Sequence, residues 1–310
     1  MQTNFRLLPV ITLVILTVFT ACQKENSKPG PDSNQELTTH ADDQNRISSQ
    51  IDAVANDISF SVESSAAYSG RMQNTLGVTT CDATVSFDSV SNPRKITITY
   101  SGTNCNGGFK RTGSVVASMP ANVHWKDQGA IITVTYQNVK VTRLVDNKSI
   151  TINGSHTITN ISGGLLYNLS NQSITHDVSS PGLTISFDDN TQRSWMVANR
   201  RVFTYNNGIV LTIHGNKTIG TTEGITEWGV NRFGHDFTTS ITQPLVIRQD
   251  CAFRLTAGQV KHDGDGGSAT VTFGLDVSGN PTSCPGLGLY YLKMNWTGPN
   301  GASASITWPY

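Results

Sequence analysis

The stretch KITITYSG, residues 95–102, decides the fold class. Its larger side chains, Ile96, Ile98 and Tyr100, stand at every second position, with a polar or small residue between them. Successive side chains of a β-strand point to opposite faces of the sheet, so this period of two predicts a strand with one covered face and one wet face.

The same alternation returns along most of the chain, around residues 85–87, 132–141, 150–152, 210–213, 245–247, 253–255 and 271–275. Turn segments such as VDNK at 145–148 separate these runs, and no strand–helix–strand spacing occurs. The sequence predicts an all-β domain over residues 71–310, a large antiparallel sheet or sandwich built of hairpins. The similar segments TINGSHTI (151–158) and TIHGNKTI (212–219) leave open two similar halves that divide near 165–185.

A different period precedes the β domain. Five apolar residues recur at three- and four-residue steps, which is the period of one helical face: Ile47, Ile51, Val54, Ile58 and Val62. This pattern predicts one short helix over residues 46–66. Residues 22–45 are polar and are broken by Pro29, Gly30 and Pro31, so we expect a disordered tether there.

Residues 1–21 have the parts of a secretory signal peptide: Arg6 near the start, an apolar run over 7–19, and small residues before Cys22. The apolar run is shorter than the roughly twenty residues of a membrane-spanning helix, so we expect cleavage. The ending resembles the lipobox of bacterial lipoproteins, which implies that Cys22 carries acyl chains and anchors the mature chain to a membrane. Ordinary secretion without a lipid is the alternative.

With Cys22 acylated, four cysteines remain: Cys81, Cys105, Cys251 and Cys284. An exported chain meets a non-reducing environment, where an even set of cysteines forms disulfides, and three pairings are possible. We favour Cys81 with Cys105 and Cys251 with Cys284, because each pair brackets a short two-strand segment. A zinc site is disfavoured because the chain has no C-x-x-C pair.

Composition and motifs argue against several function classes. Lysine plus arginine and aspartate plus glutamate both number 22, so the net charge does not favour a nucleic acid partner. The chain has no G-x-S-x-G, P-loop or H-E-x-x-H motif, and its seven histidines have no metal-ligand spacing. We expect solvated strand histidines, a glycine-rich turn at 262–267, no cofactor or metal, and no catalytic activity.

Trp195 and Trp228 are the residues that we single out for ligand binding. Exposed aromatic rings on a β-surface form platforms for the faces of sugars, so this pair predicts a glycan platform. Burial in the core is the alternative for each tryptophan, because this side chain buries a large apolar area.

Several segments resemble one family, namely CDATVSFDSVSNPRKITITYSGTNCNGGFKRTGSV, GSHTITN, RSWMVANRRVFTYNNG and TSITQPLVIRQDCAFRLTAG. They are similar to a family of uncharacterised lipoproteins of Bacteroidetes-type bacteria, whose pattern matches Cys81, the 96–98 strand, Cys105 and the Arg111-x-Gly113 motif, and later residues 244–251 and Cys284. The resemblance implies a location and a fold, and no activity. Gln23, Lys24 and Glu25 resemble the export signal that sends such lipoproteins to the cell surface.

Together these features predict a non-catalytic lipoprotein of the outer membrane that faces the cell exterior and presents a β-sheet binding or adhesive face. Its partners would be the membrane, through the acyl chains on Cys22, and an unknown surface ligand, glycan or envelope protein. A glycan-binding or carbohydrate-active accessory protein is one alternative. A structural component of an envelope assembly is another.

Overall fold

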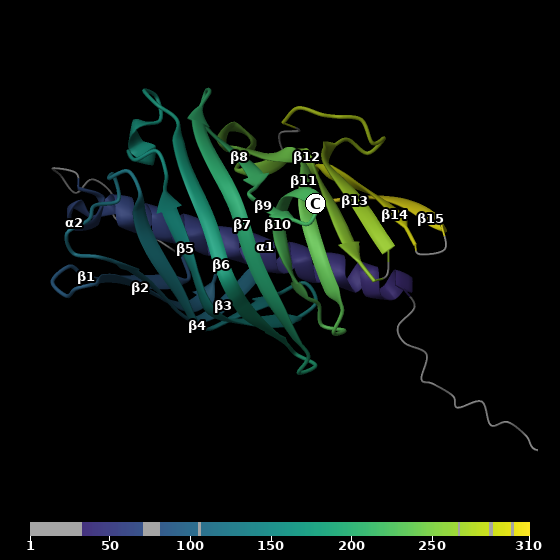
Figure 1. The fold of residues 1–310 in the computed structure, drawn as a ribbon, viewed down its shortest axis with the longest axis horizontal. Helices are drawn as coiled ribbons and strands as arrows, with labels where there is room; N and C mark the ends of the chain where they lie inside the picture. The colour runs from purple at the N-terminus through teal and green to yellow at the C-terminus, as the bar shows by residue number, and fades with distance from the viewer. Residues whose placement is uncertain (1–32, 71–80, 105–106, 266, 285–287, 299–300) are drawn as a thin grey trace, which may run out of the picture.

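A large antiparallel sheet wraps around one long helix (Figure 1). The computed structural model describes residues 33–70, 81–104, 107–265, 267–284, 288–298 and 301–310. The helices are α1 Ser33–Ser64 and α2 Ala66–Ser69, with 3₁₀ turns at Leu166–Asn168 and Gln249–Cys251. The strands are β1 Ala83–Asp88, β2 Arg94–Thr103, β3 Phe109–Met119, β4 Ala130–Arg143, β5 Ser149–Asn160, β6 Ile174–Phe187, β7 Gln192–Tyr205, β8 Ile209–Gly215, β9 Lys217–Ile219, β10 Thr222–Val230, β11 Asp236–Arg248, β12 Arg254–Gly264, β13 Gly267–Leu275, β14 Tyr291–Thr297 and β15 Ser303–Pro309.

The sheet is a meander in which neighbours in sequence are mostly neighbours in space. Its order is β1 to β7 and then β10 to β15, while β8 pairs with both β7 and β11, and β9 pairs with β10. Every pairing between these strands is antiparallel. The predicted all-β fold with a large antiparallel sheet is confirmed. None of the helices in the described ranges is long and apolar enough to cross a membrane.

Helix α1 is longer than the sequence predicted. It has 32 residues and begins at Ser33, so residues 33–45, which we expected in the tether, are helical. The prediction missed this half because its buried stripe is polar: His40, Asp43 and Gln44 follow Glu36 by four, seven and eight residues on one helical face, and all four are buried. An apolar period could not reveal a face that packs through polar groups. Residues 22–32 lie outside the described part of the chain.

The second half of α1 carries the apolar stripe that the sequence showed. Ile47, Ile51, Val54, Ile58 and Val62 are at most 2% exposed, and they pack with strand residues of β2 to β7 in one cluster. Burial of side chains of this size stabilises by about 1.5–3 kcal/mol each. We call the face of the sheet that packs on α1 the inner face, and the opposite one the outer face.

The sheet runs without a break through the predicted boundary between two halves. Strand β6, Ile174–Phe187, pairs with β5 on one side and with β7 on the other. The strands before and after residues 165–185 therefore belong to one sheet, and the similarity of the two halves stays a prediction. The ends of the strand order are β1 and β15, and six of the seven residues of β15 are exposed.

Candidate functional site

Four aspartate–arginine ion pairs connect α1 to the sheet within the described chain. Carboxylates of the helix pair with arginines of the sheet or its turns, as Asp42 with Arg143, Asp43 with Arg232, Asp52 with Arg201 and Asp57 with Arg111. We call these eight residues the helix seat. Acids thus stand on the helix and bases on the sheet, so the charges of the two surfaces are complementary.

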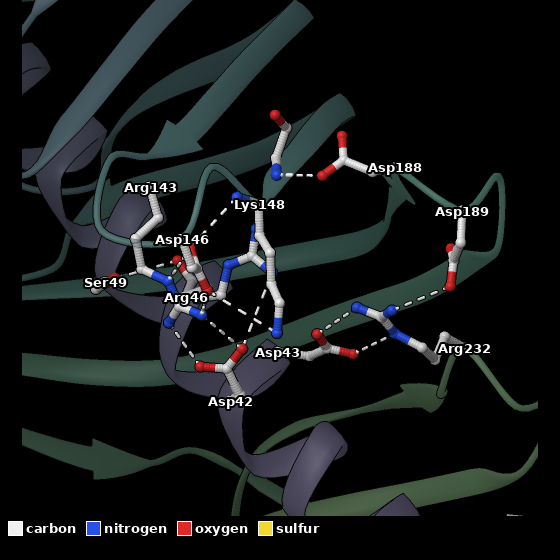
Figure 2. A network of polar contacts seen from close by, with 11 residues as sticks. Asp42, Asp43, Arg46, Ser49, Arg143, Asp146, Lys148, Asp188, Asp189 and Arg232 are labelled. Carbon is white, nitrogen blue, oxygen red and sulfur yellow. Dashed lines mark hydrogen bonds and ion pairs between the residues drawn. The ribbon is translucent and has the colours of Figure 1, made fainter.

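Arg143, at the end of β4, joins the helix to the β4–β5 turn (Figure 2). Its Nη1 donates to Asp42 Oδ1 at 2.6 Å, and its Nη2 donates to Asp146 Oδ2 at 2.6 Å. The hydrogen bond from Arg143 lowers the pKa of Asp146 to about 2. One guanidinium therefore holds a helix carboxylate and a turn carboxylate together.

Arg232, in the β10–β11 turn, makes the matching connection further along the same rim (Figure 2). It donates to both oxygens of Asp43, at 2.7 and 2.5 Å, and to Asp189 of the β6–β7 turn at 3.3 Å. Asp43 is 2% exposed, and burial raises the pKa of its carboxyl. Arg232 acts to lower this pKa, but the effect of burial is larger. Helix α1 is thus tied to three hairpin turns at one end of the sheet.

The Arg111-x-Gly113 motif lies under the second half of the helix. Arg111 binds Asp82 through two hydrogen bonds, of 2.5 and 2.7 Å, and reaches Asp57 of α1 at 3.1 Å. The Tyr100 hydroxyl also donates to Asp57, at 2.8 Å, and its ring lies 4.2 Å from the Arg111 guanidinium carbon. The arginine of this motif therefore anchors the helix.

Gly113 lies where the pairing of β3 with β4 shifts register. Its φ is +97°, and a Cβ added there would stand 2.2 Å from the carbonyl oxygen of Asn138. Only glycine fits this close backbone approach without strain. The spacing of the motif thus combines an ion-pairing side chain with a bulge two residues later.

Two further charged residues, Arg193 and Glu227, are buried beneath α1 and contact Gln44 and Ser48 of the helix. Arg193 is 1% exposed, donates to Gln44 of α1, and has its guanidinium carbon 4.1 Å from the centre of the Phe237 ring. Burial lowers the pKa of Arg193 to about 10. Glu227 accepts a hydrogen bond from Ser48 at 2.9 Å, and burial raises its pKa to about 7.

A carboxyl whose pKa lies near neutrality is a candidate general acid or base when a cleft gives substrate access to it. Glu227 lies instead beneath α1, where it is 7% exposed. We therefore assign Glu227 to the docking of the helix and not to catalysis.

Four histidines correct the expectation of solvated strand histidines. His40, His156, His176 and His262 are buried. The three strand residues face inward, since His156 stands in phase with the buried Ile158. Burial lowers the pKa of His156 and of His176 to about 3 and that of His262 to about 4.

The predicted lipidation and export residues, Cys22, Gln23, Lys24 and Glu25, lie outside the described residues. The predicted disulfide between Cys251 and Cys284 is confirmed, with Cα atoms 5.2 Å apart, and it brackets β12 and β13. Cys105 lies outside the described ranges, so its pairing with Cys81 stays a prediction. Of the predicted turn at 262–267, residues 262–264 belong to β12 and Gly267 to β13, with Gly264 opposite Gly267, so the connection between the two strands is shorter than predicted.

The predicted glycan platform of Trp195 and Trp228 is wrong as a pair. Trp195 is 1% exposed and belongs to the core around α1. Trp228 stands opposite Met196, the residue after Trp195, so it lies on the outer face. It is partly exposed, and Lys217 Nζ is 5.6 Å from the centre of its ring. The alternation of strand side chains places the two rings on opposite faces.

Hydroxyl groups are frequent on the outer face. Ser118, Thr133, Thr157 and Ser179 stand opposite one another in turn on β3, β4, β5 and β6. All four are partly or fully exposed. The row offers donors and acceptors at the regular spacing of adjacent strands, which is about 4.8 Å.

The chain matches no protein-family model, curated protein or solved structure. Function is therefore argued from the site alone. Sequence reasoning missed both the helix seat and the buried Arg193, although Arg193 and Arg201 stand in phase with the buried Trp195, Val197 and Phe203. That phase was the available signal that these arginines point inward.

Proposed function

We propose that this chain is a lipid-anchored envelope protein, held in the outer membrane through acyl chains on Cys22, that faces the exterior and binds a partner through the outer face of its sheet. The observation that carries the choice of surface is the helix seat. Because α1 packs on the inner face through its apolar stripe and these ion pairs, the outer face is the broad sheet surface that the described residues leave open to a macromolecule.

The chemistry of the outer face supports a non-catalytic binding role. The row from Ser118 to Ser179 is uncharged and rich in hydroxyl groups, and hydrogen-bonding groups of this kind suit a polar partner. The perturbed carboxyl Glu227 and the three buried strand histidines lie on the inner face, away from that row. We propose a surface protein or glycan of the envelope as the partner.

Site-specific crosslinking tests the binding face. A photo-crosslinking residue replaces Thr133 or Thr157 on the outer face, and a matched variant carries it at Ser49, an exposed residue on α1. We expect crosslinked partners from intact cells for the two outer-face positions and none for Ser49. Equal yields at all three positions would contradict a role for the outer face.

Replacing Trp228, the partly exposed member of the tryptophan pair, tests whether the partner is a glycan or a protein. Trp228→Ala removes a partly exposed aromatic ring from the outer face without opening the core around Trp195. Loss of binding on a glycan array in this variant favours a glycan, and unchanged protein crosslinks favour a protein partner.

The location is tested separately. Cys22→Ala should release the chain from the membrane fraction, and Lys24→Ala with Glu25→Ala should keep the anchor but remove exposure to an external protease on intact cells. If the native chain is fully protected from the protease and soluble in the periplasm, both the anchor and the exposure are wrong.

A further inference from the structure

A small hollow opens at the rim of the sheet beside the first half of α1. Glu36 and His40 line it from the helix, Asn231 from the β10–β11 turn, and Phe237 and His262 from β11 and β12. The tip of the β12–β13 hairpin completes its wall, with Asp263 and Asp265. Two imidazoles and several carboxylates therefore meet at one opening.

His40 is the residue that makes this hollow unusual. This residue is 5% exposed, and neither of its ring nitrogens has a hydrogen-bond partner within the part of the chain that is described. A buried polar group without a partner costs about 1–3 kcal/mol. His40 is thus an unpaired imidazole that lines a hollow, where a group from outside the protein could be its partner.

His262 stands at the right distance to share that partner. Its ring centre is 6.0 Å from that of His40, and the two planes are nearly perpendicular at 87°. Two imidazoles that bind one metal ion through bonds of about 2.0–2.1 Å have ring centres roughly 5–6.5 Å apart. The observed separation lies within this range.

One ring nitrogen of His262 has a hydrogen-bond partner within the protein. Nδ1 lies 2.8 Å from the hydroxyl oxygen of Thr239, which leaves Nε2 for a ligand. Metal-bound histidines commonly use their other nitrogen in such a hydrogen bond, because it fixes the orientation of the ring. Both rings are buried, and burial favours the neutral imidazole, which is the form that binds metals.

Glu36 is the candidate for a third ligand. It stands one helical turn before His40, on the same face of α1, and is 8% exposed. Its Oε1 accepts a hydrogen bond from Asn231 at 2.9 Å and lies 2.7 Å from His235 Nδ1. In the described residues the one set of three donors within 4.8 Å of one another is Asp250, Cys251 and Cys284, whose cysteines form the disulfide. The donor atoms of Glu36, His40 and His262 therefore do not all lie within 4.8 Å of one another, so side chains have to turn when an ion binds.

The charge of Arg193 opposes a cation here, since it lowers the pKa of both imidazoles. Glu227 and Asp43 act on Arg193 with the opposite sign, and Glu36 adds a further negative charge at the hollow. We propose that His40, His262 and Glu36 bind one divalent transition-metal ion, such as Zn²⁺. Two imidazoles and a carboxylate favour this class over Ca²⁺ or Mg²⁺, which prefer oxygen ligands alone.

Metal titration of the full chain, purified in mild detergent and stripped with a chelator, tests the proposal. We expect one Zn²⁺ per chain by equilibrium dialysis and, with Co²⁺ as the probe, visible absorption bands of a low-symmetry site. His40→Gln and His262→Gln should each weaken binding at least tenfold, and Thr239→Val about tenfold through the orientation of His262.

The matched control is His156→Gln, which changes another buried histidine whose ring nitrogens have no described partner, away from the hollow. It should bind the ion as the native chain does. Near-ultraviolet circular dichroism establishes that each variant is folded, and Glu36→Gln and Thr239→Val keep the test decisive if His40→Gln does not fold. A native chain without stoichiometric binding, or folded variants of His262 and Glu36 with unchanged affinity, would overturn the proposal.

Discussion

The guanidinium of Arg232 binds both carboxylate oxygens of Asp43, at 2.7 and 2.5 Å, across 189 residues of sequence. Asp43 is almost fully buried on α1, while Arg232 belongs to a turn between two strands. This pair therefore connects the polar half of the helix, which has few apolar contacts of its own, to the distant part of the sheet.

Asp43→Asn should lower the free energy of unfolding by about 3 kcal/mol, because it leaves Arg232 partly buried without its main partner. Urea unfolding followed by circular dichroism measures the loss. Asp177→Asn is the matched control, since Asp177 is bound by Arg200 through two hydrogen bonds of 2.8 Å on the surface. That variant should lose less than about 1 kcal/mol, and equal losses would refute the importance of the buried pair.

Gly113→Ala should lower the free energy of unfolding by about 1–3 kcal/mol more than Gly129→Ala does. Both glycines have positive φ, +97° and +80°, so the backbone strain of the two substitutions is similar. They differ because a Cβ at position 113 meets the Asn138 carbonyl, while a Cβ at position 129 has no atom within 4 Å. Thermal and urea unfolding of the two variants measure the difference. Similar losses would mean that the close approach at the bulge relaxes freely.

His176 should make the protein less stable in acid. Burial lowers its pKa in the folded chain to about 3, whereas in the unfolded chain it titrates at 6.5. As the pH falls from 6.5 towards 3, the unfolded chain therefore binds a proton that the folded chain does not. The free energy of unfolding falls by about 1.4 kcal/mol per pH unit from this residue alone.

His176→Phe should remove that part of the slope when urea unfolding is measured at several pH values. Phe203→Leu is the control, because the Phe203 ring contacts His176, with centres 5.2 Å apart, but does not titrate. It should lower stability by a similar amount at every pH. Parallel curves for native chain and His176→Phe would disprove the assignment.

Replacing both Cys251 and Cys284 with serine should cost about 3–4 kcal/mol in the chain-entropy description, because the two residues close a loop with a sequence separation of 33. Hydrogen exchange should become faster in β12 and β13, which the bond brackets. A stability change below about 1 kcal/mol would show that the hairpin holds the loop closed without the bond.

The sequence predicted the sheet well because its evidence is local. Ile96, Ile98 and Tyr100 alternate, and all three are buried on the inner face. A local period also predicted the second half of α1, because its buried apolar residues from Ile47 to Val62 recur at three- and four-residue steps. It failed from Glu36 to Asp43, where the buried face of the helix is polar and only the partners on the sheet explain the burial.

The candidate site could not be predicted because its contacts are remote in sequence. Arg143 lies 101 residues from Asp42, and Arg201 lies 149 residues from Asp52. Alternation could have placed Arg193 and His156 on the inner face, since each stands in phase with buried apolar neighbours. Which helix residue meets which arginine depends on where α1 crosses the strands, and local spacing does not encode that crossing.

Helix α1 precedes every strand of the described chain, and this order has a consequence for folding. The segment Ser33–Ser64 carries six carboxylates and one arginine, and its partners Arg111 and Arg232 follow 54 and 189 residues after Asp57 and Asp43. Until those arginines emerge, the segment bears an uncompensated negative charge, which repels other copies of itself. Closure of such long loops slows folding, and we expect the acids that later hold the helix in place to keep copies of this segment apart during that delay.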